Sequence, residues 1–185
     1  MQNTFETLAL TALWNGVVET TTNENSLLTA DKLLRENKSK IEAFWHIGRF
    51  IVMNEQGGKV TARYGEETIV SVSKYLTWKY GRGFSARNIA YMKRLFVYFP
   101  ILQAAINTRL TWSQYTEILN AETPEEVVFY KTQAEKNCWS LREIRRQVRG
   151  LMYYRLRLRG HENLTVPATP ASVNASTWYK LIFIQ

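Results

Sequence analysis

Cysteine, aspartate and long apolar runs are nearly absent from this sequence of 185 residues. The single cysteine, Cys138, excludes an intramolecular disulfide and is typical of a reducing compartment, so we expect a cytoplasmic protein. No run of about 18 apolar residues occurs, which argues against a membrane-spanning helix. The first residues carry no basic region ahead of an apolar stretch, so they do not resemble a signal peptide.

The same scarcity limits the chemistry that the side chains can perform. One cysteine and two distant histidines, His46 and His161, cannot supply the ligands of a zinc site. A two-metal nuclease needs clustered carboxylates and a lysine, yet Asp31 is the only aspartate and Glu162 the only acidic residue after Glu143. No P-loop signature is present either. We therefore expect no catalytic centre, no metal and no cofactor.

Proline and glycine are also scarce, with four and nine residues, and the apolar residues recur mostly at helical spacing. This pattern predicts an all-α fold: a multi-helix domain containing a helix-turn-helix, with a basic C-terminal helix and a short flexible tail. We divide the chain into an N-terminal extension (1–28) with a short helix near Phe5–Trp14, a helical domain (29–159) and a partly flexible tail (160–185).

A long first helix is predicted from about Thr29 to the sequence EQGGK, whose glycines can end it. Gly48 lies on its apolar face and would let another helix approach closely. A turn at Tyr64-Gly65 is expected to precede a second helix over about Glu66–Tyr80, with two glutamates in its first turn. The apolar face of the first helix comprises Ile41, Phe44, Trp45, Ile51 and Val52.

Several later helices have recognisable starting signals. Ser85 is a natural N-cap after the glycine-containing break GRGF, and the helix that it opens ends before Pro100. Thr111 can cap a helix to Leu119, and Thr123-Pro124 followed by two glutamates is a strong start. The sequence Ser140-Leu141-Arg142-Glu143 fits a capping box and predicts a basic helix to about Arg159.

The net charge of +8 is concentrated in two segments. Residues 63–98 hold seven Lys/Arg against two acidic residues, and residues 139–160 hold seven arginines against one glutamate. Clustered positive charge is the electrostatic pattern expected of a polyanion-binding protein. A basic face that merely contacts water is the alternative.

The segment from Glu66 to Tyr98 predicts helix, short turn, helix, which is the helix-turn-helix arrangement. In that arrangement the second helix enters the major groove, where arginine can bind guanine and asparagine can bind adenine in a bidentate manner. The predicted base-reading residues are Ser85, Arg87, Asn88 and Tyr91. The predicted phosphate contacts from this segment are Lys74, Lys79, Arg82 and Arg94.

The final basic helix is predicted to present one stripe of arginines opposite an apolar face. We expect this stripe to contact the DNA backbone, while docking on an acidic partner or in a homodimer interface is the alternative. A role at a membrane surface ranks third. The stripe comprises Arg142, Arg145, Arg146 and Arg149.

Two resemblances support this interpretation. The helix starts at Leu110–Ser113, Thr123–Glu125 and Ser140–Glu143 resemble those that follow the helix-turn-helix of ParB/KorB-type partition proteins. A closer resemblance covers about Asp31–Arg155, where FWHIGR, YG, YGRGFSARN, LTWS and WSLRE resemble the N-terminal domain of the bacterial YhcG-like family. Members of that family usually continue into a PD-(D/E)xK nuclease domain, so the resemblance implies a helical targeting or DNA-binding domain.

We therefore predict that residues 29–159 form a non-catalytic DNA-binding module of a nuclease system, with duplex DNA as the partner and no membrane. About 30 residues follow the last predicted helix, too few for a nuclease fold, so we expect no nuclease activity from this chain. Structured RNA in place of DNA is left open. The alternative function is a protein-interaction domain that recruits a separate nuclease subunit or forms a homodimer through the helix of Trp45.

Overall fold

The computed structural model describes residues 24–36, 39–57 and 62–159, and these residues form helices and no strands, which confirms the all-α prediction. The predicted helix near Phe5–Trp14 and the predicted tail lie outside the described residues. The chain divides into two compact units, one up to Val97 and one from Tyr98 onward, and each is described by itself. Among the described residues, no helix is long and apolar enough to cross a membrane.

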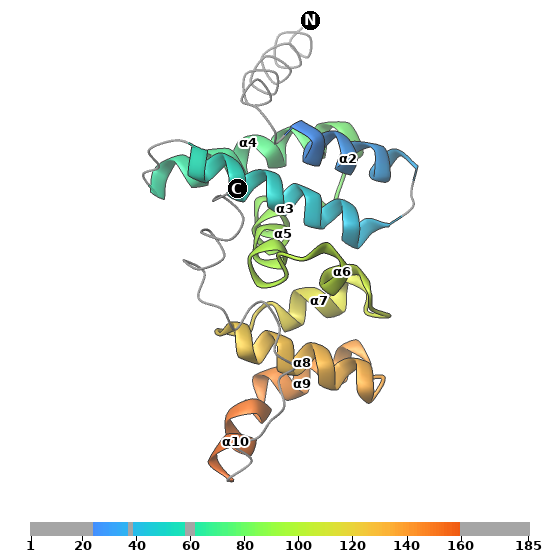
Figure 1. The fold of residues 1–185 in the computed structure, drawn as a ribbon, viewed down its shortest axis with the longest axis vertical. Helices are drawn as coiled ribbons and strands as arrows, with labels where there is room; N and C mark the ends of the chain where they lie inside the picture. Colours follow the sequence, from blue (N-terminus) through green and yellow to red (C-terminus); the bar gives the residue numbers. More distant parts are fainter. Residues whose placement is uncertain (1–23, 37–38, 58–61, 160–185) are drawn as a thin grey trace, which may run out of the picture. The chain divides into compact units, whose positions relative to one another are not determined.

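The first unit contains α2 (Glu24–Arg35), α3 (Lys40–Gly57), α4 (Ala62–Tyr80) and α5 (Ala86–Tyr98) (Figure 1). Helix α2 lies along α3, and α3 also contacts α4. The prediction of one long helix from Thr29 is wrong, because α2 ends at Arg35 and α3 begins at Lys40. Ser39 accounts for the new start, since its hydroxyl accepts a hydrogen bond from the backbone N–H of Glu42 at 3.3 Å.

The apolar face of α3 forms the centre of the first unit, as predicted. Phe44, Trp45, Ile51 and Val52 are all buried. Gly48 lies so close to α5 that an added Cβ atom would be 2.0 Å from the carbonyl oxygen of Met92. The close approach of another helix at Gly48 is thereby confirmed.

Helix α4 begins earlier than the sequence suggested. It runs without interruption from Ala62, so the predicted turn at Tyr64-Gly65 is wrong, and Glu66 and Glu67 lie beyond the first turn. A glycine inside a helix costs only about 1 kcal/mol relative to alanine, which the rest of a 19-residue helix can offset. Val72 and Leu76 are buried on the inward face of this helix.

The second unit contains α6 (Leu102–Ile106), α7 (Trp112–Ile118), α8 (Pro124–Lys136), α9 (Leu141–Arg149) and α10 (Met152–Leu158). Three of these helices begin at the predicted caps, where Thr111, Thr123 and Ser140 each accept a hydrogen bond from a backbone N–H of the first turn. The core of the unit includes the fully buried side chains of Tyr115, Ile118, Leu119, Val127 and Ile144.

The predicted single helix from Ser140 to Arg159 is wrong, because the chain breaks at Gly150 and Leu151, where Leu151 has a φ of 50°. The hydroxyl of Tyr130 lies at this break. It donates to the carbonyl of Gln147 at 3.4 Å and accepts from the backbone N–H of Tyr153 at 3.2 Å. Backbone N–H and C=O groups that lose their helical hydrogen bonds at a break need other partners when they are buried.

Candidate nucleic-acid interface

The turn between α4 and α5 is held firmly against α4. Gly81 and Gly83 have φ values of 80° and 118°, which glycine adopts without the steric cost of a side chain. The carbonyl of Phe84 accepts hydrogen bonds from Ser73 Oγ at 2.7 Å and from Thr77 Oγ1 at 3.4 Å. The direction in which α5 leaves α4 is therefore fixed by side chains of α4.

Helix α5 begins as predicted and buries one face. The Ser85 hydroxyl accepts from the backbone N–H of Asn88 at 3.3 Å, and the Asn88 side-chain amide donates to the carbonyl of Gly83. The buried face comprises Ile89, Met92, Leu95 and Phe96, and the opposite face is left at the surface of the unit. The predicted recognition helix is thus half packed and half accessible.

The predicted base-reading residues lie on or beside this accessible face. Ser85 and Arg87 are exposed, whereas Asn88 and Tyr91 are half-buried. The Arg87 guanidinium donates to the Tyr91 hydroxyl at 3.3 Å and lies 5.9 Å from the centre of that ring. The ring therefore supports the guanidinium and limits its freedom.

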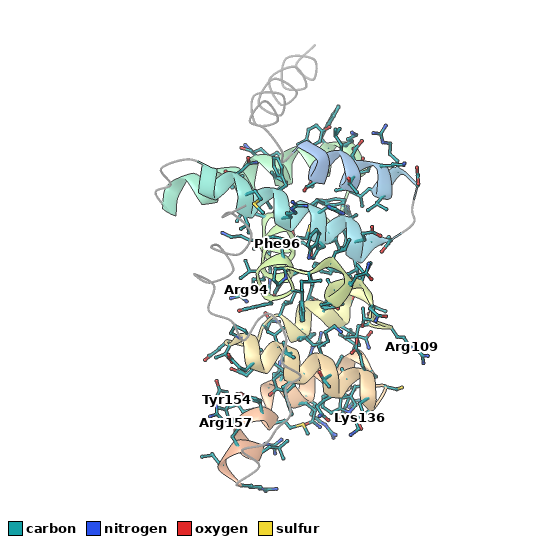
Figure 2. The ribbon with its side chains drawn as sticks, in the orientation of Figure 1. Arg94, Phe96, Arg109, Lys136, Tyr154 and Arg157 are labelled. Atoms are coloured by element: carbon teal, nitrogen blue, oxygen red, sulfur yellow. The ribbon has the colours of Figure 1, made fainter. Side chains whose placement is uncertain are left out.

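Arg94 is also exposed, and its side chain leaves α5 in a different direction from the buried Phe96 (Figure 2). Lys74 on α4 and Arg82 in the turn are exposed as well. The structure therefore leaves these three predicted phosphate contacts at the surface of the first unit.

Lys79, the fourth predicted phosphate contact, has an internal partner. Its ammonium group donates to the Asp31 carboxylate of α2 at 2.5 Å and to the Tyr75 hydroxyl at 3.2 Å. Tyr80 and Arg35 also bind the same carboxylate. Sequence analysis missed this cluster because Asp31 lies 48 positions before Lys79.

Each member of this cluster supports the ionisation state of the others. Burial acts to raise the pKa of Asp31, but hydrogen bonds from Lys79 and Tyr80, together with nearby positive charge, lower that pKa below its ordinary value. Burial and the hydrogen bond to Asp31 raise the pKa of Tyr80 to about 12. For Lys79, burial acts to lower the pKa, but the hydrogen bonds to Asp31 and Tyr75 raise it overall.

The four arginines predicted to form a stripe are all exposed on α9, opposite the buried Ile144. Two of them have carboxylate partners. Arg145 binds Glu117 through Nε at 3.0 Å and Nη2 at 2.5 Å, and Arg146 binds Glu143 at 2.7 Å. Ion-pair partners for the other two, Arg142 and Arg149, are absent from the residues that the structure describes.

Helix α10 adds exposed cations that the sequence analysis did not include in the site, namely Arg155, Arg157 and Arg159. Arg157 lies 5.7 Å from the centre of the Tyr153 ring. Their signal is the excess of arginine after Trp139, but a single continuous helix predicts only one stripe. Helix α5 belongs to the first unit and α9 to the second, so the cations of the two helices are described as separate groups.

No group of three or more His, Cys, Asp or Glu side chains that could hold a metal occurs in 24–36, 39–57 and 62–159. His46 is half-buried, its ring lies 5.1 Å from that of Trp45, and burial, followed by the charge of Arg49, lowers its pKa. Trp45 is itself 5% exposed and packs on Phe96, so its side chain belongs to the core of the first unit.

Comparison with known proteins agrees with the resemblance seen in the sequence. A family model described as the DUF1016 N-terminal domain matches residues 29–155. A curated protein of Escherichia coli (strain K12), named "Putative nuclease YhcG", is 27% identical over 168 residues, which cover 74% of this chain and 42% of that relative. The chain thus spans less than half the length of this relative. No solved structure matches.

Proposed function

Because the chain belongs to the DUF1016 N-terminal domain family and is similar to part of a protein named as a nuclease, we propose that it is a non-catalytic module that binds duplex DNA in a nuclease system. The observation that carries this proposal is the way in which α5 is packed. One face of that helix is buried, its start is fixed to α4, and its accessible face presents arginine and polar side chains.

The proposed base-reading group is Ser85, Arg87, Asn88 and Tyr91. Arg87 is the main candidate for a bidentate contact with guanine, because the Tyr91 ring already supports its guanidinium. Asn88 donates one amide N–H to the carbonyl of Gly83, which holds its side chain at the start of α5.

The proposed phosphate contacts of the first unit are Lys74, Arg82 and Arg94, with Lys79 in a secondary role because it would have to leave Asp31. In the second unit, Arg142 and Arg149 are the main candidates. Arg145 and Arg146 would first have to exchange a carboxylate for a phosphate. These arginines would hold the backbone and carry no sequence information.

A salt titration of binding to labelled duplex DNA, followed by fluorescence anisotropy, tests the proposal. Each phosphate contact should steepen the fall of log affinity with log salt by about one unit. Absence of binding even at about 50 mM salt would contradict a DNA-binding function, because phosphate contacts are strongest there.

Arg87→Ala then tests the reading role. We expect it to weaken binding to a preferred sequence by about 1–3 kcal/mol and to reduce discrimination among duplexes. Lys136→Ala, which removes one exposed positive charge from the end of α8, is the matched control and should leave discrimination unchanged (Figure 2). If Arg87→Ala binds every duplex as the wild type does, Arg87 is not a reading residue.

A second candidate function is a protein-interaction domain that recruits a separate nuclease subunit or forms a homodimer. The specific observation in its favour is the exposure of two leucines around α10, since Leu151 is 54% and Leu158 88% exposed. Sedimentation of the wild type and of a Leu151→Ser, Leu158→Ser variant would reveal self-association that depends on these leucines. A monomer at every concentration would exclude the homodimer form of this function.

A further inference from the structure

Helix α4 carries an outward stripe formed by Val70, Lys74 and Trp78, which follow one another at intervals of four residues. All three are exposed, and Trp78 keeps 54% of its surface accessible. Val72, Tyr75 and Leu76, which are buried, lie on other sides of the same helix. Trp78 is the only tryptophan among the large apolar side chains that are exposed in the described part of the chain.

Because the indole of Trp78 is exposed, the protein lacks the stabilising free energy that burial of this ring would provide. Full burial of a large apolar side chain stabilises a protein by about 1.5–3 kcal/mol, and aromatic rings contribute the largest buried areas. Within the described residues, the one aromatic ring recorded against that of Trp78 is the ring of Tyr75, at 6.0 Å and a tilt of 46°. A ligand that covers the free ring face would recover part of that free energy.

The stripe lies next to the turn that leads into α5. Ser73 and Thr77 hold the Phe84 carbonyl, and each is directly followed in sequence by a member of the stripe, Lys74 or Trp78. Successive residues of a helix are about 100° apart around its axis, so Lys74 and Trp78 lie on the strip of α4 that adjoins the strip of Ser73 and Thr77. Trp78 is also separated by only two residues from Gly81, where the turn into α5 begins.

We propose that Trp78 stacks on an unpaired nucleobase, so that the DNA bound by the first unit contains a junction between paired and unpaired strands. This inference rests on the proposed DNA-binding function and names its substrate class. Lys74, one helical turn before Trp78 on the same stripe, contacts a phosphate of the unpaired strand. Together they form an aromatic platform beside a cation, the combination by which proteins hold single strands.

Intact duplex would not use the indole in this way. Its bases are stacked on one another and its outer surface is sugar and charged phosphate, against which an apolar ring gains little. An unpaired base has a free ring face, and stacking such a base on an aromatic side chain contributes about 1–3 kcal/mol. The seven Lys and Arg residues in 63–98 could bind the phosphates of paired and of unpaired strands. The exposed indole is therefore the feature that favours a junction.

The test compares two DNA molecules that differ only in the bases of a single-stranded overhang. One carries an overhang with nucleobases, and the other carries an abasic overhang with the same number of phosphates. We expect the wild-type chain of 185 residues to bind the first about 5- to 150-fold more tightly, which corresponds to the stacking of one base. Trp78→Ala should abolish this ratio, Trp78→Phe should keep part of it, and Val70→Ala, on the same stripe, should keep all of it.

The outcomes separate this inference from the function on which it rests. Equal binding of the two overhangs by the wild type, or an undiminished ratio in Trp78→Ala, would overturn the stacking role even if duplex binding depends on Arg87. Absence of binding to any DNA would overturn both proposals. If Trp78→Ala instead removes self-association of the wild type and leaves the ratio intact, the indole belongs to an interface between two copies, and the stacking role is wrong.

Discussion

Gly48→Ala is the substitution whose effect can be worked out most directly from the structure. The new methyl group would lie 2.0 Å from the Met92 carbonyl oxygen and 2.7 Å from the carbonyl carbon. Ordinary contacts of this kind begin near 3.4 Å. Because the opposing atoms belong to the backbone of α5, no side-chain rotation can relieve the overlap, and α3 and α5 would have to move apart by about 1.4 Å.

The cost of that movement exceeds the gain from the better helix former. Alanine stabilises a helix interior by about 1 kcal/mol relative to glycine. Overpacking a tightly packed core costs about 1–3 kcal/mol or more, and here it would disturb the packing around Ile47, Ile51 and Ile89, which are completely buried. We therefore expect the free energy of unfolding to fall by about 2 kcal/mol.

Urea unfolding followed by circular dichroism measures this change. DNA binding of the folded fraction should weaken as well, because α5 is the helix that moves. If Gly48→Ala is as stable as the wild type or more stable, α3 and α5 do not approach as closely as described. The reasoning that glycine is required at position 48 for this close approach is then refuted.

Three further substitutions test other parts of the structure. Gly81→Ala should cost about 1–2 kcal/mol through its positive φ alone, since no atom lies within 4 Å of the new methyl group, and Gly81→Asn should recover part of this loss in the same unfolding assay. Tyr130→Phe should destabilise the protein by about 1–3 kcal/mol, because the hydroxyl that satisfies two backbone groups at the α9–α10 break is lost; an unchanged melting curve would contradict that role. Asp31→Asn should cost about 1–3 kcal/mol near neutral pH. The lowered pKa of Asp31 means that its contribution is complete above its ordinary value of 3.8 and is lost as the pH falls through the folded-state pKa, so the stabilities of Asp31→Asn and the wild type should converge in acid.

The sequence predicted helices best where a cap defines their start. Thr111, Thr123 and Ser140 were identified because their hydroxyls are followed by helix-forming residues, and the local hydrogen bond of a cap needs no tertiary information. Ser39 carries the same kind of signal, but the apolar spacing alone does not separate α2 from α3. The break at Leu151 could not be predicted, because it depends on the hydroxyl of Tyr130, which comes from another helix.

The same contrast between local signals and contacts with distant segments applies to the candidate site. The outward positions of α5 could be predicted from the period of its buried residues, such as Ile89 and Met92. The ion-pair partners of the candidate cations could not be predicted. The carboxylate that binds Lys79 lies on α2, and the one that binds Arg145 lies on α7. Periodicity gives the direction of a side chain, whereas pairing depends on which distant segments meet.

The Asp31–Lys79 ion pair bears on how DNA affinity would respond to ionic strength. A phosphate that binds Lys79 would displace the Asp31 carboxylate, which would keep Tyr80 and Arg35 as partners. Lys79 would then release a cation from the DNA as the other phosphate contacts do, but the loss of its ion pair would reduce what it adds to the affinity. The first unit would contribute a slope of about four units at most, from Lys74, Lys79, Arg82 and Arg94.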